Sequence, residues 1–420
     1  MDPLDALRNA ISSKPPYCTG TIPITDDNGV VYYRKQEQAG WLDLSRATEG
    51  DLEALVQACE PATFGLEQRD VLDESYRKAW KMDRTNFAPR FDIGESHLVE
   101  RIRAQLLDAR DNTKGIKAEL YKLNVYGKDS FFKSHKDTPR SDTMFGSLVV
   151  VFPTPHEGGA LVLRHAGQEW TFDSAAVLRE KEQRSMAYIA FFSDVDHEVT
   201  VVTSGYRVTL TYNLFFESGE SDHPASDVVP VAFKDTVFQT ALTSALEDPN
   251  FLPKGGCLGF GLSFKYPIKR GQSLTSLRKI SKMLKGNDSM IKHVCEQMKL
   301  PTTLNAIYQD KYRETKILVD EIMNMGDGEI EGLLDLLAEY PHNGRLIYDY
   351  GEEPPRTWHG PIEERSIGIL WVTPLTTYSH FNSPYVHYGN EASLGCAYGD
   401  LCLTVKVGPY ENRRGSIESL

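Results

Sequence analysis

The sequence lacks the long apolar runs, paired cysteines and basic stretches that mark several large classes of protein. No apolar stretch of roughly 18 residues occurs, so the sequence predicts no membrane-spanning helix. None of the six cysteines forms a C-x-x-C pair, which disfavours a structural zinc site. No long Lys/Arg run is present, and the formal net charge is −13. Because phosphate binding depends on Lys and Arg, nucleic acid is an unfavoured partner.

The beginning of the sequence also has little that resembles a targeting signal. The stretch MDPLDALRNAISSKPP is polar and has no apolar segment of the kind that a secretory signal contains. We therefore expect a cytoplasmic or nuclear protein whose cysteines are reduced and mostly buried.

The length of 420 residues exceeds what one core ordinarily supports, so it predicts two domains. The polar, turn-rich segment ESGESDHPASD (217–227) is the expected boundary. We expect residues 1–117 to form an N-terminal support of helices and strands for the domain that follows. Residues 118–217 are expected to form the strand-rich core of that domain, and residues 228–420 a C-terminal α+β domain. The role of that last domain is left open, and a second, degenerate barrel is one form it could take.

Short apolar runs separated by turns fill the segment from about residue 118 to residue 216. Many short strands at this spacing predict a β-sandwich or open barrel, so the expected fold class is mostly β with helices. The run SLVVVF is apolar, as expected of a strand buried on both faces. Nearer the N-terminus, TEGD (48–51) predicts the start of a helix, and a strand pair is expected around the turn DDNG (26–29).

His135 and Asp137 stand two residues apart in the segment FFKSHKDT. In an extended chain, residues i and i+2 lie on one face, so both side chains can reach one ion. Taken alone, H-x-D is weak evidence, because a surface turn would look the same. His197 supplies a second imidazole at the start of the strand run HEVTVV. Two imidazoles and one carboxylate make a facial triad that leaves three positions of an iron ion open.

Arg207 follows ten residues after His197 and opens the strand run RVTLTYNLFF. Its planar guanidinium offers a bidentate fork for a carboxylate deeper in the same barrel, which a lysine would hold less well. Thr209 lies two places further on the same strand face and can add a hydroxyl hydrogen bond.

Together these motifs resemble the Fe(II)/2-oxoglutarate-dependent oxygenase superfamily, in particular its prolyl 4-hydroxylase-like branch and fungal members of it. The resemblance covers roughly residues 118–216 and rests on four segments, LYKLNVYGKDSFFKSHKD, VVFPTPHEGGALVLRH, FFSDVDHEVTVV and GYRVTLTYNL. It implies a double-stranded β-helix (jelly-roll) barrel. It also implies that the iron ligands are His135, Asp137 and His197.

The resemblance further implies that the cofactors are Fe(II), 2-oxoglutarate and dioxygen. 2-Oxoglutarate would chelate the iron and pair its far carboxylate with Arg207, with Tyr126 and Thr209 as further contacts. The reaction would release succinate and carbon dioxide and usually leave a hydroxyl group on the substrate. Phe132 stands where a tyrosine often precedes the H-x-D motif in animal prolyl hydroxylases.

The substrate is not specified by these motifs. A protein side chain of the prolyl type is slightly favoured, because the motifs are prolyl-hydroxylase-like and the large added domain could hold a macromolecule. The alternatives are a small-molecule (natural-product) oxygenase and a non-catalytic binding scaffold with an oxygenase fold. A scaffold is expected to have lost a ligand or the arginine, and this chain keeps all four residues. No membrane partner is expected, and the oligomeric state is left open.

Other polar residues near the motif have structural explanations. Asp194 and Asp196 lie just before His197 and could orient its imidazole, or they could form the corners of a tight turn. His156 and His165 are assigned no role.

Overall fold

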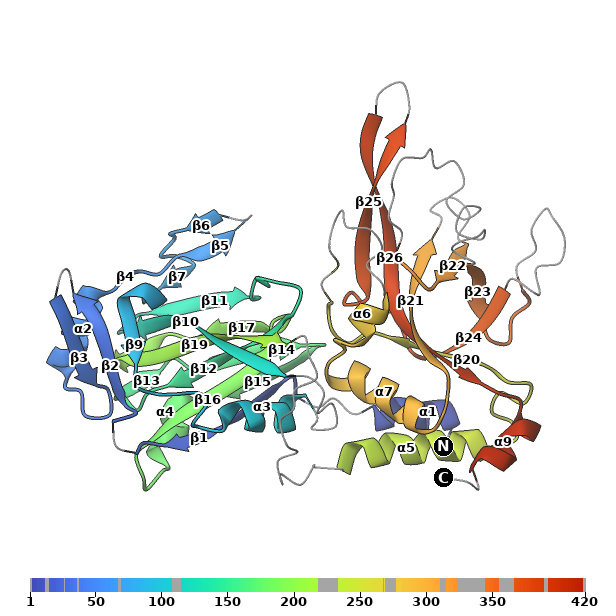
Figure 1. Cartoon of the computed structure of the whole chain (residues 1–420), viewed down its shortest axis with the longest axis horizontal. Helices are drawn as coiled ribbons and strands as arrows, with labels where there is room; N and C mark the ends of the chain where they lie inside the picture. Colours follow the sequence, from blue (N-terminus) through green and yellow to red (C-terminus); the bar gives the residue numbers. More distant parts are fainter. Residues whose placement is uncertain are drawn as a thin grey trace. The chain divides into compact units, whose positions relative to one another are not determined.

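The computed structural model of the chain describes residues 2–11, 15–25, 27–35, 38–66, 69–107, 115–217, 233–266, 268, 277–309, 315–322, 344–354, 366–388 and 392–417. The chain divides into two compact units (Figure 1). We call residues 15–230 the central unit, and residues 1–14 together with residues 231–420 the C-terminal unit.

Two β-sheets form the framework of the central unit. The larger sheet has seven strands, in the order β1 (Tyr17–Pro23), β16 (Ser185–Phe192), β12 (Met144–Val151), β19 (Arg207–Phe216), β10 (Ile116–Tyr126), β8 (Trp80–Asp83) and β4 (Glu60–Pro61). The smaller sheet has five strands, in the order β15 (Gln168–Phe172), β14 (Leu161–His165), β17 (Asp196–Val199), β11 (Phe131–His135) and β7 (Arg77–Lys78). Shorter pieces complete the unit: β2 (Val30–Lys35), β3 (Gln38–Asp43), β5 (Phe64–Leu66), β6 (Arg69–Val71), β9 (Phe87–Pro89), β13 (His156–Gly158), β18 (Val202–Gly205) and the 3₁₀ turn η1 (Arg84–Asn86).

From β10 onward the chain alternates between the two sheets. β10, β12, β16 and β19 lie in the larger sheet, whereas β11, β14, β15 and β17 lie in the smaller one. This alternation makes a double-stranded β-helix, which confirms the predicted mostly-β jelly-roll fold. Every residue of β16 is buried, and all but one residue of β12 are buried, as expected of strands covered on both faces.

Helices α2 (Glu49–Ala58), α3 (Leu98–Leu106) and α4 (Ser174–Arg179) flank the sheets of the central unit. The predicted helix start at TEGD is confirmed: Thr48 is the N-cap of α2, and its side chain accepts a hydrogen bond from the backbone N–H of Asp51. The carboxylate of Asp51 accepts from the backbone N–H of Thr48 in return, at 2.9 Å. The expected strand pair around DDNG is wrong, because β1 pairs with β16 and β2 pairs with β3 and β9.

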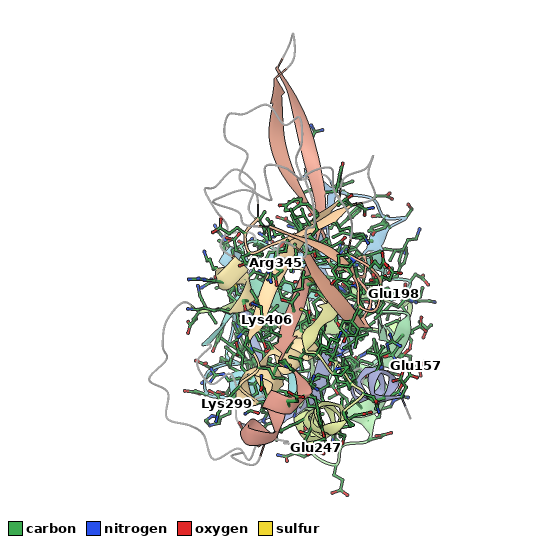
Figure 2. The ribbon with its side chains drawn as sticks, turned by 90° about the vertical axis from the view of Figure 1, so that its right-hand side faces the viewer. Glu157, Glu198, Glu247, Lys299, Arg345 and Lys406 are labelled. Atoms are coloured by element: carbon green, nitrogen blue, oxygen red, sulfur yellow. The ribbon has the colours of Figure 1, made fainter. Side chains whose placement is uncertain are left out.

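The described strands of the C-terminal unit form one sheet that closes on itself. Its order is β25 (His380–Tyr388), β26 (Ala392–Val407), β21 (Thr302–Gln309), β22 (Lys316–Val319), β23 (Arg345–Asp349), β24 (Ser366–Thr373) and β20 (Gly256–Gly261). β20 pairs in parallel with β24 and antiparallel with β26, which closes six of the strands into a barrel. Arg345 and Lys406, labelled in Figure 2, belong to this sheet. The C-terminal unit therefore contains a second barrel. It is built from a single closed sheet, whereas the β-helix of the central unit is built from two sheets.

Among its described residues, the C-terminal unit has the helices α1 (Pro3–Ala10), α5 (Phe233–Glu247), α6 (Leu277–Ser281), α7 (Gly286–Gln297) and α9 (Tyr410–Ile417). Leu7 and Ala10 of α1 lie in the same apolar cluster as Phe238 of α5 and Leu258 of β20. The prediction that all of residues 1–117 support the catalytic domain is therefore wrong for residues 1–14. The expected boundary at 217–227 lies, except for Glu217, outside the described residues.

Two expectations drawn from what the sequence lacks can be compared with the structure. No helix among the described residues is long and apolar enough to cross a membrane. Cys18, Cys257, Cys295 and Cys402 are buried thiols outside any disulfide, and Cys59 is a partly exposed one.

Leu210 tests how far the stability of the central unit depends on its β-helix core. This β19 side chain is fully buried, so Leu210→Ala removes apolar contacts and leaves a cavity. We expect it to lower the free energy of unfolding by about 2–5 kcal/mol, measured by denaturant unfolding. Val201→Ala is the control, because Val201 is 47% exposed and should change stability by less than about 0.5 kcal/mol. Equal effects of the two changes would contradict the expectation.

Candidate metal centre

The two predicted histidine ligands lie opposite each other on neighbouring strands. His135 ends β11 and is the direct pairing partner of His197 on β17, with ring centroids 4.2 Å apart. Asp137 lies two residues beyond His135, just after β11 ends. The possible ligand atoms of the three residues all lie within 4.8 Å of one another. The structure therefore brings together the three side chains that the H-x-D motif and His197 predicted.

Backbone carbonyls set the tautomer of both imidazoles. Nδ1 of His135 lies 2.8 Å from the carbonyl oxygen of Lys133, and Nδ1 of His197 lies 3.1 Å from that of Val195. A carbonyl oxygen can only accept, so each Nδ1 carries the proton and donates it. Each Nε2 is then left with a free lone pair for a metal ion, the arrangement usual for histidine ligands.

Ser147 holds the carboxylate of Asp137 in place. Its hydroxyl, from the buried strand β12, donates a hydrogen bond of 2.5 Å to Oδ2 of Asp137. The other carboxylate oxygen, Oδ1, lies 3.9 Å from Nε2 of His197. One oxygen is thus engaged by the protein while the other faces the imidazoles, which favours a carboxylate that binds a metal through a single oxygen.

Aromatic rings enclose the two imidazoles. The ring of Phe132 stacks on His135 with centroids 3.6 Å apart, and the ring of Phe191 lies 4.6 Å from that of His197. Burial, and after it the neighbouring His197, lowers the pKa of His135 below its ordinary value. His135 is therefore neutral at physiological pH, as a metal ligand must be.

Arg207 lies in the same β-helix and is almost completely buried, with 1% of its surface exposed. Burial lowers the pKa of its guanidinium, but an arginine of this kind stays protonated near neutral pH. Its Nε is buried and has no hydrogen-bond partner among the described residues. A buried cation with an unused donor is costly unless an anion completes it, so this position suits the carboxylate of a bound ligand.

Gly159 leaves room for the Arg207 side chain. A Cβ atom on this glycine would lie 3.0 Å from Cδ of Arg207 and 2.8 Å from a methyl carbon of Val202. Its φ of +66° also favours glycine. Gly159 therefore shapes the wall around the arginine.

Tyr126 and Thr209, the two further residues predicted to contact 2-oxoglutarate, lie beside this arginine. Tyr126 is the pairing partner of Arg207 across β10 and β19, and the guanidinium carbon lies 5.6 Å from its ring centroid. Thr209 is 1% exposed and lies two residues along β19. Their contact with a co-substrate remains a prediction.

Asp196 and His156, polar residues near the triad, interact with other protein groups. The imidazole of His197 is oriented by the Val195 carbonyl, and Asp196 instead forms an ion pair of 3.3 Å with Lys136. His156 is a buried histidine whose Nδ1 donates to the carbonyl of Thr154 at 2.7 Å.

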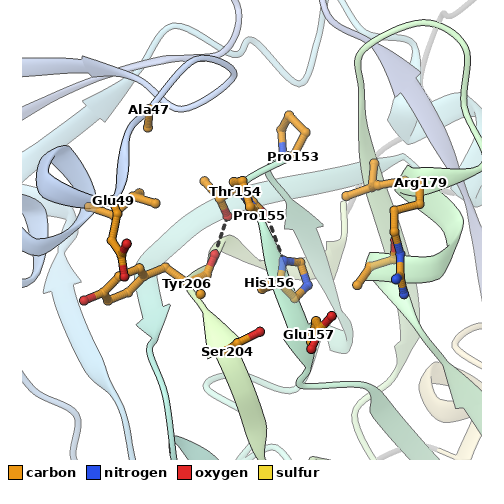
Figure 3. A pocket seen from close by; sticks show the side chains of 14 residues that line it. Ala47, Glu49, Pro153, Thr154, Pro155, His156, Glu157, Arg179, Ser204 and Tyr206 are labelled. Atoms are coloured by element: carbon orange, nitrogen blue, oxygen red, sulfur yellow. Dashed lines mark hydrogen bonds between the residues drawn. The ribbon is translucent and has the colours of Figure 1, made fainter.

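A cleft of about 610 Å³ lies at His156, between Thr154, Glu157, Arg179 and Tyr206 (Figure 3). None of the three triad residues lines this cleft. It is separate from the candidate metal centre.

Sequence reasoning missed Ser147, Phe191 and the stacking of Phe132 on His135. A signal for Ser147 was present, because it is the one hydroxyl residue in the otherwise apolar run SLVVVF. A polar side chain in a strand buried on both faces needs a hydrogen-bond partner. The two aromatic contacts depend on which strands pair, and the local sequence does not show that.

A family model agrees with the site. Residues 121–215 match the model of the 2OG-Fe(II) oxygenase superfamily. No curated protein matches the chain. A prolyl-4-hydroxylase from Pseudomonas putida is similar in structure, with 17% identity, a TM-score of 0.29, and coverage of 51% of this chain and 99% of that one. A prolyl hydroxylase from Trichoplax adhaerens, solved with a hypoxia inducible factor peptide fragment, has 14% identity, a TM-score of 0.32, and coverage of 50% and 88%.

The chain therefore carries a 2OG-Fe(II) oxygenase domain, which is the domain of 2-oxoglutarate-dependent dioxygenases. Its cofactors are Fe(II), 2-oxoglutarate and dioxygen, as predicted. The residues present fit these cofactors, because two imidazoles and one carboxylate suit Fe(II), and the unused donor of Arg207 suits a carboxylate.

Ser147→Ala tests whether the hydrogen bond to Asp137 prepares the centre for a metal ion. Loss of a partner that orients a ligand typically weakens metal binding, so we expect the dissociation constant to rise about 10- to 100-fold. The measurement is an anaerobic titration with Co(II), followed by its visible absorption. Ser185→Ala is a matched control, since Ser185 is also a buried strand serine, but its hydroxyl donates to the carbonyl of Gln183. Unchanged Co(II) affinity in Ser147→Ala would contradict the expectation.

Proposed function

We propose that this dioxygenase hydroxylates a protein side chain, of the prolyl type, with Fe(II) held by His135, Asp137 and His197. In this proposal Arg207 anchors the far carboxylate of 2-oxoglutarate. The observation that carries the assignment is the buried guanidinium of Arg207, whose Nε has no partner among the described residues. Such a charge in the same β-helix as the His-Asp-His cluster is best explained by a dicarboxylate that binds between them.

Bound Fe(II) and 2-oxoglutarate supply the oxidising chemistry, in which dioxygen is consumed and a C–H bond of the substrate is hydroxylated. The protein's own residues then have separate tasks. His135, Asp137 and His197 would hold the metal through two imidazoles and one carboxylate, a ligand set that leaves positions open for other ligands. Arg207 aligns the co-substrate by charge and by its planar fork of donors. Tyr126 and Thr209 limit how that co-substrate can lie.

A protein substrate is supported by two features of the chain. Its motifs resemble those of the prolyl 4-hydroxylase-like branch, although Phe132 replaces a frequent tyrosine. The C-terminal unit adds a second folded body with its own core, large enough to bind a macromolecule. A small-molecule substrate is the alternative.

The metal and co-substrate assignment can be tested by the visible absorption of anaerobic protein with Fe(II), before and after 2-oxoglutarate is added. We expect a charge-transfer band in the wild type and none in His135→Ala. Arg207→Ala should keep the band but need a higher concentration of 2-oxoglutarate, by about tenfold or more, because a charge-assisted pair is lost. Arg164→Ala is the control, because this arginine forms surface ion pairs with Glu169 and Glu198. No band in metal-replete wild type would overturn the assignment and favour a non-catalytic scaffold.

The substrate class requires a different experiment. The wild type and His135→Ala are each produced in cells that lack their own copy of this protein. The proteins captured with each form are then compared by mass spectrometry. The expected result is a +16 Da modification on a captured protein that depends on the active form. If no protein changes while 2-oxoglutarate is still turned over with a metabolite extract, the substrate is a small molecule.

A further inference from the structure

A second buried arginine, Arg77, lies next to the candidate metal centre, and sequence reasoning did not find it. It belongs to β7 and is the pairing partner of Phe132 on β11. Its side chain is 7% exposed, and its guanidinium carbon lies 4.4 Å from the centroid of the Phe132 ring. Phe132 in turn stacks on His135 at 3.6 Å. Only one aromatic ring therefore links this charge to a proposed iron ligand.

The partners of Arg77 are neutral. One terminal nitrogen donates to the backbone carbonyl of Thr63 at 2.6 Å, and the other donates to Oδ1 of Asn124 at 2.8 Å. The amide of Asn124 donates onward to the hydroxyl of Thr211 at 3.0 Å. Among the described residues, Nε of Arg77 is buried without a hydrogen-bond partner, and no carboxylate forms an ion pair with this side chain. Its positive charge is thus held by dipoles and not by an acidic group.

We propose that Arg77 is a positioning residue of the metal centre, whose buried positive charge favours Fe(II) over Fe(III) and whose contact with Phe132 fixes the His135 ring. The inference rests on the proposed function, because it assumes iron at the triad. Oxidation of Fe(II) to Fe(III) releases one electron and adds one unit of positive charge to the site. A fixed positive charge nearby opposes that change, and a poorly hydrated interior screens it weakly.

The arrangement distinguishes this task from that of Arg207. Each terminal nitrogen of Arg77 already donates a hydrogen bond, to Thr63 and to Asn124, and the guanidinium lies over the Phe132 ring. Arg207 has no such hydrogen bonds to described residues. One arginine is available to bind a ligand, and the other acts through the field that it creates and the ring that it supports.

The test is a redox titration of the full-length protein loaded with iron, without 2-oxoglutarate. It measures the Fe(III)/Fe(II) midpoint potential, together with the rate of air oxidation of the Fe(II) form. Arg77→Met removes the charge and keeps a long apolar chain, so we expect a lower potential and a several-fold faster oxidation. Arg77→Lys keeps the charge and should stay close to the wild type.

Asn124→Asp is a second route to the same result that leaves Arg77 in place. The new carboxylate would neutralise the guanidinium, so the potential should again fall. This variant, with Arg77→Lys, decides the matter if Arg77→Met fails to fold. Arg413→Met is the matched control: Arg413 is a buried arginine of the C-terminal unit whose guanidinium donates to backbone carbonyls, including that of Phe251 at 2.9 Å. It should leave the potential unchanged.

The possible outcomes separate this inference from the proposed function. Folded, iron-bound Arg77→Met and Asn124→Asp with the wild-type potential would overturn the inference and leave the proposed function intact. A shift in Arg77→Lys as large as that in Arg77→Met would also overturn it, because packing and not charge would then be the cause. Failure of the wild type to bind iron at the triad would overturn both.

Discussion

The candidate metal centre depends on the antiparallel pairing of β11 with β17. That pairing places His135 directly opposite His197. It also positions Asp137, which lies two residues beyond the end of β11. Side chains alternate across a strand, so a register shift of one residue would move an imidazole to the other face of the sheet. The neighbouring strands fix this register: β14 pairs with β17 on one side, and β7 pairs with β11 on the other.

Within that register, the protein prepares the three side chains for a metal before any metal arrives. Both imidazoles are held in one tautomer by backbone carbonyls, and the carboxylate is held by Ser147. Lys133 lies within β11 and Val195 immediately precedes β17, so the sheet positions both carbonyls. Most of the conformational entropy of the ligand side chains is therefore lost when the β-helix folds. Less remains to be lost when the metal binds.

The predictable parts of this structure are those that depend on residues near one another in the sequence. The strands of the β-helix, the start of α2, and the triad with Arg207 all follow from short-range patterns or from motif spacing, and the structure brings the triad together. What failed depends on distant pairings. The segment 17–35 looked like a hairpin, but β1 pairs with β16 more than 150 residues away. Arg77 gave no signal, because its neighbours Thr63, Asn124 and Phe132 come from three other segments. The same holds for α1, whose apolar face packs with α5 of the C-terminal unit.

The two buried arginines show why burial of a charge alone does not identify a ligand-binding residue. Arg207 and Arg77 are both more than nine-tenths buried, and both have an Nε without a partner. They differ in what surrounds the terminal nitrogens, which in Arg77 already donate to a carbonyl and an amide. A guanidinium that donates hydrogen bonds to fixed dipoles can remain charged without an anion. A buried guanidinium without such partners is unstable, and a bound carboxylate would stabilise it. The state of hydrogen bonding, and not the depth of burial, is therefore what separates an anchor for a ligand from a charge that acts on its neighbours.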